Sequence, residues 1–128
     1  MKSTIRDAGD LASVVSVTGD LDIYTAPVLN RDLRALIARG RAHIIVNLEN
    51  VPYIDSTGIG VLMDALRPTR LFGGSILVVT RTERMKRLFA FLGLSTVLPI
   101  FDDEISAVSS LISDSKNRRN SLATSPST

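Results

Sequence analysis

Two kinds of hydrophobic pattern alternate along the chain. Five segments carry β-branched and other apolar residues in alternating or continuous runs, as is typical of strands; they cover residues 3–6, 11–18, 43–48, 75–80 and 95–100. After each of the last four segments, apolar residues recur every three or four positions, which is typical of a helix packed on one face. This order predicts an α/β fold: a single domain with a mixed, mainly parallel central sheet of about five strands and about four helices.

The helical spacing also predicts which side chains face the core. In chain order these are Val28, Leu29, Leu33, Leu36, Ile37, Ile59, Leu62, Met63, Leu66, Met85, Leu88, Phe89, Leu92, Ile105, Val108, Leu111 and Ile112. Thr25 is a candidate cap of the first helix, and Gly40 is expected to end it. Pro68 lacks an N–H and should kink or end the second helix early. Pro99 interrupts the last predicted strand, which therefore belongs at a sheet edge.

The basic character of the chain comes from its C-terminal end. Three of its 15 Lys and Arg residues, but only one of its 13 acidic residues, lie beyond residue 113. The body therefore carries 12 charges of each sign, and without Trp it offers little for phosphate tracking or base stacking. Residues 113–128 are rich in Ser, Asn, Thr and Pro, so we expect a domain over 1–112 and a disordered tail over 113–128. We expect no direct binding of nucleic acid.

Composition also excludes several kinds of site. The chain has no Cys and a single His, His43, so disulfides, Cys-based sites and multi-His metal sites are excluded. No apolar run reaches the roughly 18 residues needed to span a bilayer. The first residues lack the apolar stretch of a secretory signal. We therefore expect a cytoplasmic protein with no membrane association, no metal and no cofactor.

The segment between the third predicted strand and the second predicted helix holds the main candidate chemistry, Asp55-Ser56-Thr57-Gly58. A helix N-terminus has free N–H groups and a positive dipole end, so a phosphate on Ser56 would be tolerated there. In the structural alternative, Asp55 or Ser56 only caps the helix. Gly58 and Gly60 would then permit close packing of the helix on the sheet. The two interpretations are compatible.

Other polar residues have simpler explanations. Asp20 and Asp22 follow a strand end and could approach Ser56, but turn formation and capping also explain them, for Asp20 above all. Asp22 could also help coordinate a magnesium ion brought by a phosphate donor, or a basic group of a partner. His43 has no carboxylate or hydroxyl neighbour in sequence, and the basic residues of 81–87 fit a solvated helix face. No catalytic constellation emerges, and we expect a binding protein, not an enzyme.

Three segments in the same order resemble a known family. They are Val17-Thr18-Gly19-Asp20-Leu21-Asp22 followed by Thr25-Ala26, then Ile45-Val46-Asn47-Leu48-Glu49-Asn50-Val51, then Tyr53-Ile54-Asp55-Ser56-Thr57-Gly58-Ile59-Gly60-Val61-Leu62. Together they are similar to the STAS domain, and specifically to stand-alone bacterial anti-sigma factor antagonists. The resemblance covers about residues 3–112; Pro68 and the long tail depart from the common pattern.

The resemblance implies a phosphorylation switch. In the family, the serine after the motif's aspartate, here Ser56, is phosphorylated by an anti-sigma factor that is itself a serine kinase. The unmodified antagonist binds that anti-sigma factor and frees the sigma factor, and a serine phosphatase resets the cycle. The resemblance places the partner-binding surface at Asp22, Asp55, Ser56, Thr57 and Gly58. The alternative is a STAS-fold scaffold or small-ligand-binding module that phosphorylation does not control.

Overall fold

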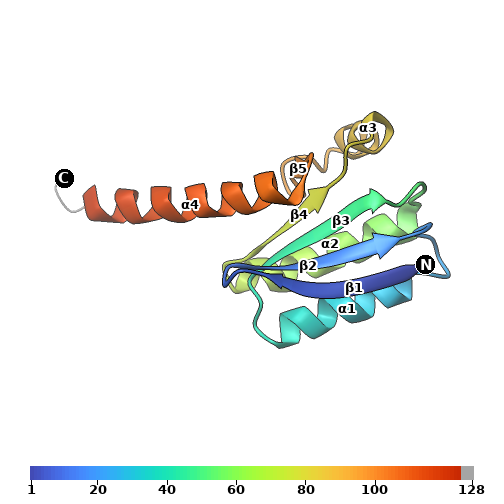
Figure 1. The fold of residues 1–128 in the computed structure, drawn as a ribbon, viewed down its shortest axis with the longest axis horizontal. Coiled ribbons are helices and arrows are strands. Elements are labelled where there is room, and N and C mark those ends of the chain that lie inside the picture. The colour runs from blue at the N-terminus through green and yellow to red at the C-terminus, as the bar shows by residue number, and fades with distance from the viewer. Residues whose placement is uncertain (125–128) are drawn as a thin grey trace.

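The computed structural model describes the backbone of residues 1–124 and the side chains of residues 1–114. Five strands and four helices alternate along it (Figure 1). In chain order they are β1 (Lys2–Ala8), β2 (Ala12–Thr18), α1 (Ala26–Ala38), β3 (His43–Asn50), α2 (Ser56–Leu71), β4 (Ser75–Val79), α3 (Glu83–Phe91), β5 (Ile100–Phe101) and α4 (Glu104–Thr124). The predicted number and order of elements are confirmed.

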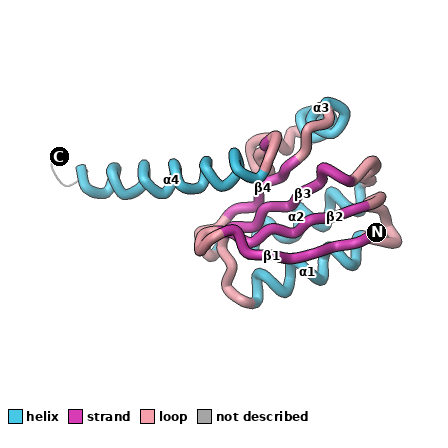
Figure 2. The backbone as a smooth tube through the Cα atoms, in the orientation of Figure 1, coloured by secondary structure: helices cyan, strands magenta, loops and turns pink. Residues whose placement is uncertain are grey.

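The strands form one mixed sheet in the order β1-β2-β3-β4-β5 (Figure 2). Only β1 is antiparallel; it pairs with β2 across a turn in which Gly9 has a φ of 65°. The other neighbours are parallel, so the carboxyl ends of β2, β3 and β4 lie at one edge. The predicted mainly parallel sheet is therefore correct, and its parallel part places three strand-to-helix loops together.

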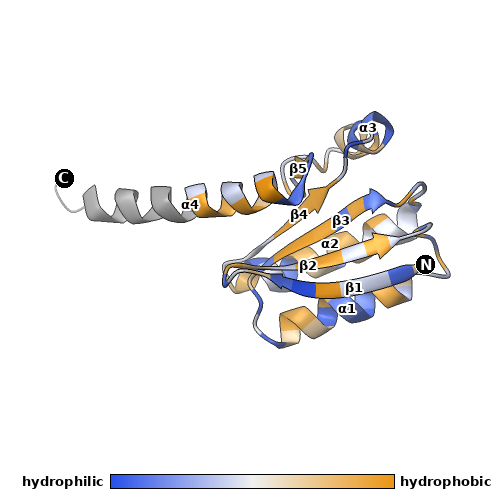
Figure 3. Ribbon diagram, in the orientation of Figure 1, coloured by the Kyte–Doolittle hydropathy of each residue, from blue (hydrophilic) through white to orange (hydrophobic). Residues whose placement is uncertain are grey.

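Apolar layers cover both faces of the sheet. The larger cluster lies between the sheet and α1, α2 and α3, and includes Leu29, Leu36, Leu62 and Phe89. A smaller cluster lies on the other face, where Ala107 and Leu111 of α4 cover side chains of β2, β3 and β4. The hydropathy colouring shows these three strands as predominantly hydrophobic (Figure 3). This burial on both faces explains their nearly continuous apolar sequences.

Four side chains predicted to face the core do not. Met63, Leu92, Ile105 and Ile112 are 37%, 47%, 80% and 42% exposed. In α4 the buried residues are Ala107 and Leu111, and each helical residue advances by about 100°. Ile105 therefore points roughly opposite to Ala107, and Ile112 lies to one side of the contact. The small side chain of Ala107 defines the face that approaches the sheet.

Of the two effects predicted for Pro68, a kink or an early end of the helix, the early end does not occur. The helix α2 continues to Leu71, and Asp64, whose carbonyl loses its usual partner, is exposed to water. Beyond the proline, buried Thr69 donates its hydroxyl to the Ala65 carbonyl at 2.7 Å. The amide of Gly74 then closes the helix end on the Thr69 carbonyl at 2.9 Å. Burial of Leu66 and Thr69 therefore holds the last turn in place despite the missing hydrogen bond.

The last predicted strand is shorter than expected and begins later. Residues 94–98 form a turn, in which the amide of Leu98 donates to the Leu94 carbonyl at 2.8 Å, and Leu98 is buried. Only Ile100 and Phe101 pair with β4, at the sheet edge that Pro99 predicted. The apolar residues of 95–100 thus reflect a turn packed on the core as well as a strand.

The helix α4 continues to Thr124 and extends beyond the sheet (Figure 1). The structure thus draws residues 113–124 as helix, residues 125–128 lie outside the described part of the chain, and the expected disorder over 113–128 is not tested. The division into a domain over 1–112 and a tail stays a prediction. Of the helices described, none combines the length and the hydropathy that crossing a bilayer requires.

Candidate functional site

The loops that follow β2 and β3 are joined at the carboxyl edge of the sheet. Leu21 and Ile54 form an isolated parallel bridge. The amide of Leu21 donates to the Tyr53 carbonyl at 2.9 Å, and the amide of Asp55 donates to the Leu21 carbonyl at 3.1 Å. Asp22 and Asp55 each follow one of the bridged residues. The structure therefore brings together two sequence segments that were predicted to meet.

Asp55 is the N-cap of α2. Its backbone is extended, and its Oδ1 accepts hydrogen bonds from the amides of Thr57 at 2.9 Å and Gly58 at 3.2 Å. Ser56 is the first residue of the helix and is exposed, whereas Thr57 is half-buried. Within the described part of the chain the Ser56 hydroxyl forms no hydrogen bond. The structure thus assigns the capping to Asp55 and leaves the Ser56 hydroxyl accessible.

This capping changes the expected electrostatics of the site. The sequence predicts free N–H groups at the start of α2, but the Asp55 carboxylate already occupies those of Thr57 and Gly58. Its negative charge also offsets the positive end of the helix dipole. An anion at Ser56 would therefore lie beside a carboxylate instead of at an unneutralised helix end.

Gly58 and Gly60 have different environments, contrary to the shared role predicted for them. A Cβ at Gly58 would lie 2.9 Å from side-chain atoms of Leu21 and Ile54 and 3.1 Å from the Leu21 carbonyl oxygen. A Cβ at Gly60 would meet no atom of another described residue outside the local helix backbone within 4 Å. Gly58 alone permits the start of α2 to approach the bridged loops.

Asp22 organises the entry into α1. Its Oδ1 accepts from the amides of Tyr24 at 2.9 Å and Thr25 at 3.1 Å, while its own amide donates to the Thr25 hydroxyl oxygen at 2.9 Å. This reciprocal pair resembles a capping box. Contrary to the prediction, the Thr25 side chain does not cap α1, because its hydroxyl accepts from the Asp22 amide and donates to the Asp20 carbonyl.

Large exposed apolar side chains lie in the same two loops. Ile23, Tyr24 and Tyr53 are 61%, 87% and 46% exposed. Sequence reasoning did not select them, although two aromatic residues in loops of a chain with only 5% aromatic residues were a usable signal. Exposed aromatic side chains are enriched at protein–protein interfaces, so these three extend the candidate surface around Ser56.

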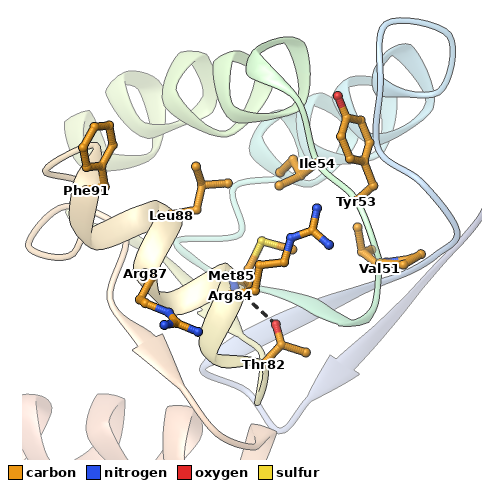
Figure 4. Close-up of a pocket in the computed structure, with 10 residues that line it drawn as sticks. Val51, Tyr53, Ile54, Thr82, Arg84, Met85, Arg87, Leu88 and Phe91 are labelled. Atoms are coloured by element: carbon orange, nitrogen blue, oxygen red, sulfur yellow. Dashed lines mark hydrogen bonds between the residues drawn. The ribbon is translucent and has the colours of Figure 1, made fainter.

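A groove of about 580 Å³ lies beside this surface, between the β3–α2 loop and α3 (Figure 4). Val51, Tyr53 and Ile54 form one wall, and Arg84, Met85, Arg87, Leu88 and Phe91 of α3 form the other. Within the part of the chain with described side chains, neither arginine forms a hydrogen bond or an ion pair. The sequence did not predict this groove.

The other basic and polar candidates are paired. Lys86 donates to Asp102, which raises the pKa of the lysine above its usual value, and Arg81 donates to the Asp102 carbonyl. His43 Nδ1 lies 2.9 Å from the Ser75 hydroxyl on the neighbouring strand, as suits a structural residue. Among the described residues, no group of three His, Cys, Asp or Glu side chains could hold a metal ion.

Comparison with known proteins points to one family. The STAS domain family model matches residues 4–107. The anti-sigma-B factor antagonist of Bacillus subtilis (strain 168) is 37% identical over 86 residues, which cover 67% of this chain and 78% of the relative. The anti-sigma-B factor antagonist of Staphylococcus aureus (strain NCTC 8325 / PS 47) is 36% identical over 86 residues, which cover 67% of this chain and 80% of that relative.

A solved structure with the same fold is described as an anti-sigma factor antagonist from Mycobacterium paratuberculosis. It has a TM-score of 0.73 and 26% identity, and the match covers 85% of this chain and 92% of that one. The Bacillus cell fate determinant SpoIIAA in its phosphorylated form has a TM-score of 0.69 and 21% identity, and the match covers 86% of this chain and 99% of that one. The second match concerns the fold alone.

Proposed function

The chain belongs to the STAS domain family, and from this premise we propose that it is an anti-sigma factor antagonist whose binding is switched off by phosphorylation of Ser56. One observation carries the proposal: at the start of α2 Ser56 is exposed beside the N-cap Asp55, and its hydroxyl forms no hydrogen bond with any residue whose side chain is described. The naming of two relatives as anti-sigma-B factor antagonists supports it. So does the phosphorylated form in which a protein of the same fold was solved.

The proposed partners follow from this role. The unmodified protein binds an anti-sigma factor that is also a serine kinase, and so releases a sigma factor; a serine phosphatase restores the unmodified state. The contact surface comprises Asp22, Asp55, Ser56 and Thr57, with the exposed Tyr24 and Tyr53 around them. Gly58, which the resemblance also placed there, is buried against Leu21 and Ile54 and so supports this surface from beneath. The protein acts by binding in the cytoplasm and has no catalytic role of its own.

The switch works through charge. Phosphorylation adds about −1.5 to −2 charges at pH 7. Because Asp55 already occupies the Thr57 and Gly58 amides, the first turn of α2 has few free donors to compensate that charge. A partner packed over Ser56 would meet both anions, and repulsion with desolvation should weaken the complex by a few kcal/mol, on the order of a hundredfold in affinity.

Substitution of Ser56 tests the switch. We expect Ser56→Ala to remain folded and to bind the anti-sigma factor whether or not ATP is present, whereas Ser56→Glu binds more weakly. Ser109→Glu, at an exposed position on α4, is the matched control for an added charge and should bind normally. Calorimetry that gives equal affinities for Ser56→Ala and Ser56→Glu would contradict the electrostatic mechanism.

Mapping of the modified residue tests the site itself. After incubation with ATP and the cognate kinase, mass spectrometry should find the phosphate on Ser56, because Thr57 is half-buried. A phosphate mainly on Thr57, or on a serine after residue 113, would refute the assignment. Absence of any phosphate would favour the alternative, a STAS-fold module that phosphorylation does not control.

Asp22 could serve phosphorylation and partner binding through its charge, or it could only shape the entry into α1. One variant separates these two roles. Asp22→Asn keeps an Oδ1 acceptor for the Tyr24 and Thr25 amides but removes the charge. We expect nearly normal thermal stability, with slower phosphorylation of Ser56 or altered partner affinity. A variant that unfolds readily, yet whose folded fraction is phosphorylated and binds normally, would show that Asp22 only shapes the entry into α1.

A further inference from the structure

The groove between the β3–α2 loop and α3 has the size and lining of a small-molecule site. Its volume of about 580 Å³ lies in the range of roughly 300–1,000 Å³ that such sites occupy. Val51, Ile54, Met85 and Leu88 provide apolar walls, and Phe91 lies at one end (Figure 4). A molecule that fills this groove must therefore have an apolar body.

The charge of the lining is of one sign. Two arginines line the groove, and of the residues with described side chains no Asp or Glu does. Figure 4 shows the Arg84 side chain over Met85, with its guanidinium directed toward the wall that holds Ile54 and Tyr53. On the same helix, Lys86 is held by Asp102 and Glu83, whereas Arg84 has no ion pair among the residues with described side chains.

We propose that this groove binds a small amphipathic carboxylate. Its alkyl body, of roughly eight to twelve carbon atoms, suits a site of this size and contacts Val51, Ile54, Met85 and Leu88. Its carboxylate pairs with Arg84, since a planar guanidinium can donate two parallel hydrogen bonds to the two oxygens. Arg87 adds positive charge at the same groove.

The site does not depend on the proposed switch, but it lies next to it. Tyr53 and Ile54 form one wall of the groove and directly precede Asp55 and Ser56. A bound ligand would therefore lie alongside the surface proposed for the anti-sigma factor. Ligand binding is measured on the free protein, so its failure would leave the proposed function untouched.

A titration of the full ¹⁵N-labelled chain with decanoate, followed by NMR, tests the proposal. We expect saturable shifts at the amides of Val51, Tyr53 and Ile54 and of residues 82–91, and none with acetate. Decyltrimethylammonium, which has the same chain and the opposite charge, should bind at least tenfold more weakly. Arg84→Gln should weaken decanoate binding about tenfold, as loss of a charge-assisted hydrogen bond implies.

Arg67→Gln is the matched control. Arg67 is also exposed and lines a second apolar hollow, of about 400 Å³, with Met63, Leu66 and Leu71. This variant should bind decanoate like the unmodified chain, and the spectra of both variants report whether they are folded. Equal binding of the cationic analogue, no effect of Arg84→Gln, or shifts confined to the second hollow would overturn the proposal.

Two further outcomes would assign the groove to another occupant and also overturn the proposal. Groove amides that shift when the free protein is diluted would indicate a second copy of this chain. Groove amides that respond to the anti-sigma factor but not to decanoate would indicate a protein partner only.

Discussion

Replacing Gly58 with alanine should destabilise the domain, whereas the same change at Gly60 should stabilise it. The added Cβ at Gly58 would lie 2.9 Å from Leu21 Cγ and Ile54 Cγ1, closer than real Cβ contacts, and 3.1 Å from the Leu21 carbonyl oxygen. Leu21 is fully buried, so its branched Cγ has no free space to move into. Overpacking of this kind costs about 1–3 kcal/mol.

The control lies on the same helix. At Gly60 a Cβ makes no close contact with the described part of the chain, so only the higher helix propensity of alanine remains, worth about 0.5–1 kcal/mol in favour of the fold. The propensity gain applies to both variants. The difference between their free energies of unfolding therefore isolates the contact with Leu21 and Ile54, at about 1–3 kcal/mol.

Urea denaturation of the two variants measures this difference directly. A lower midpoint with an unchanged m-value for Gly58→Ala would show a loss of stability without a change of denatured state. If Gly58→Ala is as stable as Gly60→Ala, the start of α2 does not depend on close approach to the bridged loops, and the argument from the glycine contacts is refuted.

Three further predictions concern stability. Asp55→Ala should lower the free energy of unfolding by about 0.5–2 kcal/mol because it removes the cap, whereas Asp55→Asn keeps an acceptor; equal urea midpoints would contradict this. Deleting residues 114–128 should shift the melting temperature by less than about 8 °C, as a loss below ~1 kcal/mol implies; a larger shift would show that the tail contributes to the fold. The pKa of Asp103 should lie below its usual value, because the Ser106 amide donates to its carboxylate. Its contribution to stability is then present above the ordinary pKa and lost as the pH falls through the lowered one, which NMR titration of the carboxyl carbon would measure; an unshifted pKa would contradict it.

Most of the sheet could be predicted because its strands have distinctive sequences. β2, β3 and β4 are buried on both faces and therefore consist largely of apolar residues in continuous runs. The cap of α2 could be narrowed to Asp55 or Ser56, since capping depends on residues within one turn of each other; the structure selects Asp55. Local interactions of this kind appear in the sequence as short, specific patterns.

Other features depend on contacts that no local pattern records. Whether Ile105 is buried depends on which side of α4 meets the sheet. The residue that packs closely on that side is Ala107, whose small side chain contributes little to a hydrophobic pattern in the sequence. The helix continues through Pro68 because Leu66 and Thr69, on either side of the proline, are buried. The groove joins residues 51–54 to residues 82–91, so its existence depends on the sheet order.

The bridge between Leu21 and Ile54 has a consequence for motion at the site. Leu21 uses both its amide and its carbonyl to hold the β3–α2 loop, at 2.9 Å to Tyr53 and 3.1 Å from Asp55. Separating the loops breaks both bonds in one event, so the amides of Leu21 and Asp55 should become exposed together and show similar protection from hydrogen exchange. The loop that carries Asp22 and the loop that leads into Ser56 would then open as a single cooperative unit, and a ligand or partner that orders one of them would slow exchange in the other.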